Sequence, residues 1–180
     1  MKPDRRAAFL RGINVGRAKR IAMADLRNVV SSLGYGNVQT LLNSGNVVFD
    51  VPKGTKHDVA ARLEKAIAGS LGVSSRVTVL TADELSTVIA ENTIAELASD
   101  ASRLLVSLLR EPGDRAKVLP LLKEVWEPDA LAVGSRAVYA WCGGGILESR
   151  LASTLGRLLG DGATTRNWAT LLKVQALVLP

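Results

Sequence analysis

The sequence predicts an α+β protein made of two related ferredoxin-like (split βαβ) halves with antiparallel or mixed sheets and a C-terminal helix. Short apolar runs typical of strands alternate with longer runs of period 3.6 that are typical of helices. Over residues 1–100 their order is β-α-β-β-α-β, which is the order of a split βαβ unit. The same order begins again over residues 101–180, which predicts a second related half.

In the first half, turn residues separate the expected elements. The expected strands are short apolar runs over residues 7–11, 38–42, 47–51 and 77–80. A helix with apolar spacing from Met23 to Leu33 ends at Gly34. Thr55 with Asp58 predicts the start of a second helix, and Thr81 with Glu84 that of a third, because both pairs have the spacing of a capping box.

In the second half, strands are expected over 104–109, 131–133 and 137–141, the last two joined by a hairpin. Helical spacing appears within 118–125 and 147–159. A fourth strand is not evident, so a helix from about Arg166 to Ala176 is expected in its place, started by Thr164 or Thr165.

Composition excludes several classes of protein. The chain has 180 residues with 47% hydrophobic content, enough for a sizeable core, and no apolar run approaches the ~18 residues of a membrane span. Its one cysteine, Cys142, excludes an internal disulfide, and a cytoplasmic location is expected. Cys and His show no metal-ligand spacing, and no nucleotide-binding fingerprint occurs, so neither a metal nor a cofactor is expected.

The charge of the chain is concentrated at its N-terminus. The net charge is +6, and the first 20 residues carry all of it, since the remaining 160 have equal numbers of acidic and basic side chains. Those first residues set one acid, Asp4, against Lys2, Arg5, Arg6, Arg11, Arg17, Lys19 and Arg20. The Gly- and Arg-rich stretch from Arg11 to Gly16 lies among them, and this pattern suits the holding of an anion.

Topology predicts which polar loops meet. The first two strands of a split βαβ unit run parallel, so the loop over residues 12–20 and the turn over 43–46 should lie at one edge of the sheet. The residues gathered there would be Arg11, Asn14, Arg17, Asn43, Ser44 and Asn46. Backbone N–H groups beside the helix that starts near Ala22 would make this edge an anion site. The alternative is that the glycines only form turns and the arginines are solvated.

Four blocks of sequence are similar to a known family. They are Phe9–Gly16, Gly34–Thr40, Asn43–Phe49 and Thr164–Trp168, and they resemble the bacterial family labelled domain of unknown function 1697. The resemblance spans nearly the whole chain and implies a ferredoxin-like α+β fold, but no activity. Asn43 departs from the glutamine that relatives commonly have there, and Arg17 replaces a glycine that many of them carry.

The last block supplies the remaining candidates. Arg166 could clamp a phosphate or carboxylate, Asn167 could hydrogen-bond a ligand, and Trp168 could stack on a planar group. The alternative is that Thr165 caps a helix, Trp168 packs in the core and Arg166 is solvated. No catalytic residue is identified, because His57 is expected to be solvated and Cys142 to be inert.

The prediction for function is the binding of an anionic small molecule that bears phosphate or carboxylate groups. The expected ligand-binding residues are Arg11, Gly12, Asn14, Ser44, Gly45, Asn46, Arg166 and Asn167, gathered in one site. Two alternatives remain: an enzyme acting on a phosphorylated or carboxylated metabolite, and a protein that binds nucleic acid weakly and without sequence specificity. No membrane partner is expected.

Overall fold

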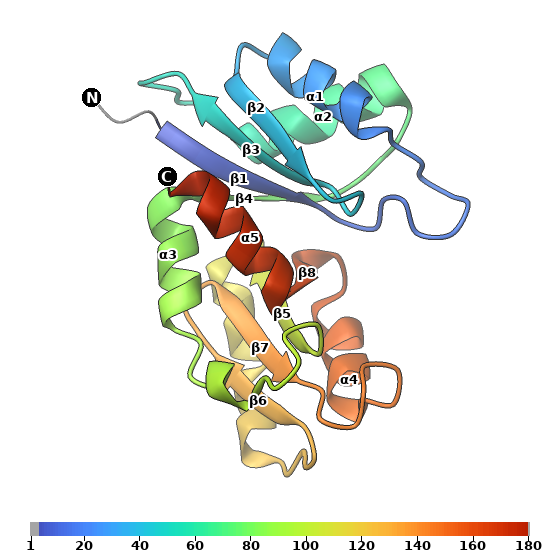
Figure 1. Cartoon of the computed structure of the whole chain (residues 1–180), viewed down its shortest axis with the longest axis vertical. Helices are drawn as coiled ribbons and strands as arrows, with labels where there is room; N and C mark the ends of the chain where they lie inside the picture. The colour runs from blue at the N-terminus through green and yellow to red at the C-terminus, as the bar shows by residue number, and fades with distance from the viewer. Residues whose placement is uncertain (1–3, 180) are drawn as a thin grey trace. The chain divides into compact units, whose positions relative to one another are not determined.

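A computed structural model describes residues 4–179 of the chain. The fold is mixed α+β, with two four-stranded antiparallel sheets and a C-terminal helix (Figure 1). The chain divides into two compact units. The first unit comprises the residues up to Leu85 together with those from Val174 on, and the second comprises Ser86–Lys173. Each unit contains one of the sheets and is described separately.

The first sheet has the order β2-β3-β1-β4. Its strands are β1 (Asp4–Leu10), β2 (Gly36–Leu41), β3 (Asn46–Val51) and β4 (Val77–Thr81). Both β1 and β2 pair antiparallel with β3, so these two strands run in the same direction. Their C-terminal ends therefore lie at the same edge of the sheet, which is the property on which the predicted site depends.

Helices α1 (Met23–Ser32) and α2 (Val59–Leu71) supply apolar side chains to the core of the first unit. Leu26, Leu63 and Ile67 are almost fully buried there, in one cluster with Leu10 and Phe49 of the sheet. The apolar residues of each helix recur about every 3.6 positions, so they lie on one face of the helix, and this face is the buried one.

Two helix starts test the capping patterns. The pair at α3 (Ala82–Ala90) is confirmed: the Thr81 backbone N–H donates to Glu84 Oε2 at 2.9 Å, and that of Glu84 donates to Thr81 Oγ1 at 3.2 Å. The capping box predicted at α2 is wrong, because Asp58 alone caps that helix, by accepting from the Ala61 N–H at 3.1 Å. Thr55 instead donates its hydroxyl to the carbonyl oxygen of Pro52, closing the preceding turn.

The second sheet has the order β6-β7-β5-β8. Its strands are β5 (Leu104–Leu109), β6 (Ala130–Val133), β7 (Ala137–Trp141) and β8 (Ala163–Asn167). Helix α4 (Arg150–Leu159) contributes Leu151, Leu155 and Leu159 to a core shared with Val138 of β7. Short 3₁₀ helices occupy much of the rest: η1 (Ala95–Leu97), η2 (Pro112–Lys117), η3 (Leu119–Lys123) and η4 (Gly160–Gly162).

Two expectations for the second unit were wrong. The fourth strand exists as β8, and α5 (Trp168–Val178) begins only after it, not at Arg166. Thr164 and Thr165 are β-branched and favour a strand, and Thr165 Oγ1 lies 2.9 Å from Ser107 Oγ on β5. The helix expected within 118–125 is replaced by the shorter η3, which has a proline in its first turn.

In the described range, residues 4–179, none of the helices combines the length and apolarity needed to cross a membrane.

Candidate functional site

The loop after β1 and the turn between β2 and β3 lie side by side, as the topology predicts. The side-chain N–H of Asn14 donates to the carbonyl oxygen of Asn43 at 2.7 Å. The backbone N–H of Leu10 donates to the carbonyl oxygen of Gly45 at 2.8 Å. Figure 1 shows both segments at the same end of the first sheet. The predicted convergence of residues 12–16 with residues 43–46 is therefore confirmed.

Asn14 organises the loop over residues 12–20, on which Arg17, Lys19 and Arg20 are exposed. Its Nδ2 also donates to the carbonyl oxygen of Ile21 at 2.9 Å, while its Oδ1 accepts from the Ile21 N–H at 2.9 Å. Its backbone N–H donates to the carbonyl oxygen of Lys19 at 3.0 Å, with φ at 54°. Both N–H bonds of the Asn14 amide are therefore used within the chain, and the side chain closes residues 14–21 into a compact loop.

The Ser44-Gly45-Asn46 block has a structural role in the turn. Asn46 is fully buried, and its Nδ2 donates to the carbonyl oxygen of Leu41 at 2.8 Å and to Ser44 Oγ at 3.0 Å. Gly45 is buried with φ at 84°. A Cβ atom at Gly45 would approach the Leu10 Cβ and the Ile13 Cδ1 to 2.8 Å each. Only glycine fits this position without movement of its neighbours.

A cavity opens where these segments meet the N-terminus of α1. It has a volume of about 350 Å³ and is lined by Asn14, Arg20, Ile21, Ala22 and Asn43. The N-cap residue of α1 is Ala22, which has no side chain able to accept a hydrogen bond from the first turn. The N–H groups of a first helical turn have no partner within the helix, so the cavity lies against the positive end of the α1 dipole.

The basic residues near this cavity fall into two groups. Arg17, Lys19 and Arg20 are exposed on the loop over residues 12–20. Gly12, at the start of the same loop, is also exposed and has a φ of 66°. Arg11 is half-buried, and its backbone carbonyl accepts from the Ser75 hydroxyl at 2.8 Å.

Two arginines of the same segment form ion pairs away from the cavity. Arg5 Nη1 lies 2.8 Å from Asp50 Oδ1, and Arg6 Nη2 lies 2.6 Å from Asp4 Oδ2. Lys2 lies outside the described residues. Within residues 4–20, the exposed positive charge is thus concentrated on the loop over residues 12–20.

In the second unit, Arg166 is buried and Asn167 has a structural role. Arg166 lies in β8 with 9% of its surface exposed, and desolvation by burial lowers its pKa to about 10. Asn167 Oδ1 accepts from the Thr170 N–H at 2.9 Å and so caps α5, the role expected of Thr165. The interpretation of Arg166 as solvated is wrong, whereas the interpretation of Trp168 as a core residue is confirmed at 9% exposure. A common site with Arg11 and Asn14 stays a prediction.

Removing the cap of α5 is expected to have a modest effect on stability. Asn167→Ala should lower the free energy of unfolding by about 1 kcal/mol, because the Thr170 N–H loses its acceptor. Asn167→Asp keeps an acceptor oxygen at the same place and serves as the matched control. Urea denaturation measures both, and an unchanged stability of the alanine variant would contradict the capping role.

The other reactive side chains do not form an evident catalytic group. His57 is exposed, and its Nε2 lies 3.0 Å from the Tyr35 hydroxyl and 3.1 Å from Arg62 Nη1. Cys142 is buried, and desolvation raises the pKa of its thiol, which disfavours the thiolate. Within residues 4–179, His, Cys, Asp and Glu form no group of three or more that could hold a metal ion.

Sequence reasoning left Arg20 and Asn43 out of its final set of ligand-binding residues, although both line the cavity. One signal could have found this place. The helix over residues 23–32 follows an alanine and not a Ser, Thr, Asp or Asn, so the sequence itself shows a helix N-terminus without a side-chain cap.

Comparisons with known proteins give a family and a fold. A family model described as "Protein of unknown function (DUF1697)" matches residues 4–139. Among solved structures, the chain is similar to the conserved bacterial protein SP0830 from Streptococcus pneumoniae, with a TM-score of 0.80 and 23% sequence identity. The match covers 99% of this chain and 100% of the other. No curated protein matches the chain.

Proposed function

The chain belongs to the family of proteins of unknown function DUF1697, which assigns no activity, so from the site itself we propose that it binds an anionic ligand bearing phosphate or carboxylate groups. The ligand lies at the edge of the first sheet, between the loop over residues 12–20 and the turn over residues 43–46. Arg11 and Arg20 supply charge, the exposed Gly12 allows a ligand to approach the backbone closely, and Gly45 lets the turn pack against Leu10 and Ile13. Asn14, Ser44 and Asn46 hold the two segments in place.

One observation carries the proposal: the cavity lies at a helix N-terminus that no side chain caps, with exposed cations beside it. A helix N-terminus favours negative charge, because the N–H groups of its first turn point outward. Arg20 lines the cavity, and Arg17 and Lys19 are exposed on the same loop. The one acid in the first turn of α1, Asp25, is exposed and does not line the cavity.

Thermal unfolding with inorganic pyrophosphate tests the proposal. A ligand at about 100 times its dissociation constant stabilises the native state by about 2.7 kcal/mol, which raises Tm by about 5–10 °C in a protein of this size. Chloride at equal ionic strength corrects for screening. Arg20→Ala should reduce the rise to less than about half, because a charged contact is lost.

The matched control is Arg115→Ala, which removes the same charge from an exposed position in η2 of the second unit. This variant should retain the full rise in Tm. An equal loss of response in both variants would mean that net charge alone attracts the anion, and the proposed site would then be rejected.

The two alternatives are separated by further measurements. Binding of a generic oligonucleotide whose affinity falls steeply with salt, about tenfold for each tenfold rise in salt per phosphate contacted, would favour nucleic-acid binding. Turnover of a phosphorylated metabolite with a pH-dependent rate would favour an enzyme. Saturable pyrophosphate binding without either result supports the simple binding protein. A cytoplasmic location stays a prediction.

The architecture supports a finer proposal about the fold. We propose that each sheet belongs to a ferredoxin-like split βαβ unit, one within residues 1–100 and a related one within residues 101–180. In support, the orders β2-β3-β1-β4 and β6-β7-β5-β8 correspond strand for strand. In the second unit, 3₁₀ helices occupy the place that α1 has in the first.

A further inference from the structure

We propose that the first unit has a second binding site, which takes a neutral ligand with an imide or amide edge, such as a pyrimidine nucleoside. A cavity of about 650 Å³ lies between the edge strand β2 and the end of α5 at Ala176 and Leu177. This volume is within the range of about 300–1,000 Å³ that is typical of small-molecule sites. The site is distinct from the anion cavity, with which it shares no lining residue.

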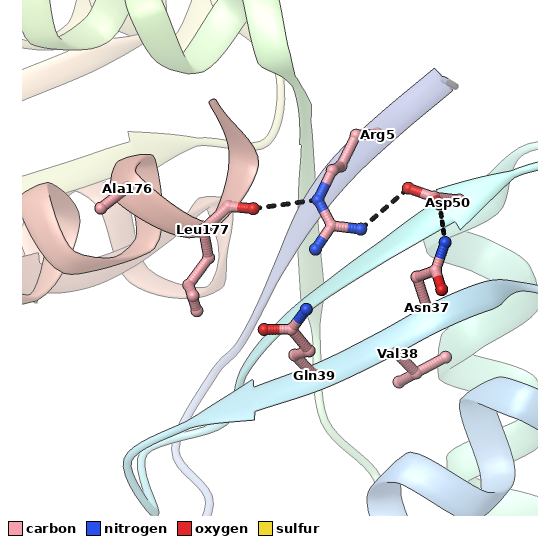
Figure 2. Close-up of a pocket in the computed structure, with 7 residues that line it drawn as sticks. All are labelled: Arg5, Asn37, Val38, Gln39, Asp50, Ala176 and Leu177. Atoms are coloured by element: carbon pink, nitrogen blue, oxygen red, sulfur yellow. Dashed lines mark hydrogen bonds and ion pairs between the residues drawn. The ribbon is translucent and has the colours of Figure 1, made fainter. Parts of the chain in front are cut away.

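Three side chains on neighbouring strands form the polar wall of this cavity (Figure 2). Arg5 of β1 and Asp50 of β3 are opposite each other in the sheet and pair at 2.8 Å, with only 12% and 14% of their side chains exposed. Asn37 of β2 donates from Nδ2 to Asp50 Oδ2 at 2.5 Å. Arg5 Nε also donates to the carbonyl oxygen of Leu177 at 2.9 Å, which fixes the guanidinium in place.

The charges of this wall cancel, which argues for a neutral ligand. Burial by itself raises the pKa of Asp50, but the hydrogen bonds from Asn37 and Arg5 and the positive charge of Arg5 outweigh it and hold the pKa below its usual value. Asp50 therefore remains ionised and neutralises Arg5 at pH 7. An ion entering the cavity would lose hydration without meeting an unbalanced opposite charge.

Two hydrogen-bonding groups of the wall remain available. The Gln39 side chain is exposed and makes no hydrogen bond with residues 4–179, and the contacts of Arg5 use its Nε and Nη1 but not its Nη2. Figure 2 shows the Gln39 carboxamide and the Arg5 guanidinium facing the same space. Together they offer two donors and one acceptor, which match in number the two acceptors and one donor on the edge of an imide. Rotation of the exposed Gln39 carboxamide places its oxygen between the two donors.

The strand is irregular at this place. The register between β2 and β3 shifts between Gly36 and Gln39, and Asn37 has a φ of 46°. A bulge of this kind redirects side chains on an edge strand and is common beside functional sites. Here it accompanies a wall in which Asn37 contacts the ion pair while Gln39 remains available to a ligand.

Titration of the full chain with uridine tests the inference, by calorimetry and by the side-chain amide resonances of Gln39. Uridine should bind saturably and shift these resonances. Gln39→Leu should weaken binding about tenfold or more, because two hydrogen bonds are lost. The ligand 3-methyluridine, in which a methyl group replaces the imide N–H, should bind about tenfold more weakly as well.

Gln175→Leu is the matched control, because it changes the same residue type on α5 outside the cavity lining, and it should bind uridine like the native chain. Thermal unfolding should show that Gln39→Leu remains folded, since the side chain is exposed. Absence of saturable binding at millimolar uridine would overturn the inference, as would equal affinity for 3-methyluridine or an undiminished affinity of Gln39→Leu.

Discussion

Gly45→Ala is expected to lower the free energy of unfolding by about 2–5 kcal/mol. A left-handed φ of 84° costs about 1–2 kcal/mol for a residue with a Cβ. The new Cβ would also lie 2.8 Å from the Leu10 Cβ, which is fixed to the backbone of β1 and cannot rotate away. Overpacking of this kind adds about 1–3 kcal/mol. Urea denaturation followed by circular dichroism measures the loss.

Gly12→Ala is the matched control for this prediction. Gly12 has a similar φ of 66°, but a Cβ there would meet no atom within 4 Å. The control should therefore lose only the conformational part, about 1–2 kcal/mol. Equal losses in the two variants would show that contact with Leu10 does not constrain the turn, and the structural account of Gly45 would have to be abandoned.

Asn14→Ala is expected to lower the free energy of unfolding by about 2–3 kcal/mol and to abolish the pyrophosphate-induced rise in Tm. The Asn14 side chain makes three hydrogen bonds, to the backbone of Ile21 and Asn43, and each contributes about 1 kcal/mol. Without them the loop no longer holds Arg20 beside the α1 N-terminus. Thermal unfolding with and without pyrophosphate measures both effects in one experiment.

Asn43→Ala provides the comparison. Asn14 contacts the backbone carbonyl of Asn43, which the substitution keeps. The free energy of unfolding of Asn43→Ala should therefore differ from that of the native chain by less than about 0.5 kcal/mol. If Asn14→Ala were as stable as the native chain, the side chain would not organise the loop. If that variant lost stability but kept the full pyrophosphate response, loop closure would not be needed for anion binding.

Much of the secondary structure could be predicted from local patterns. The strand expected over residues 104–109 is β5, and that over 137–141 is β7, because short apolar runs bounded by turn residues leave few other possibilities. The capping box of Thr81 and Glu84 was equally local. The pattern failed at residues 163–167, where threonines next to a helix were interpreted as caps although they pair with β5 as a strand. Pairing with a distant strand is not visible in a local window.

The candidate site, like the secondary structure, could be predicted only in part. Strand order alone predicted that residues 12–16 would meet residues 43–46, because parallel strands end at one edge of a sheet. It could not predict that Asn14 uses one amide N–H bond for that contact and the other to close its own loop at Ile21, that Asn167 caps a helix, or that Arg166 is buried.

The sequence by itself determined the periodicity of the elements, the family and the concentration of positive charge in the first 20 residues. The tertiary structure decided which of those charges are available. Arg5 is held by Asp50 and by the end of α5, whereas Arg20 is exposed beside an uncapped helix, although both are arginines of one basic segment. The physical reason is that the electrostatic role of a charge depends on its burial and on partners far away in the chain, and only the folded chain brings those partners together.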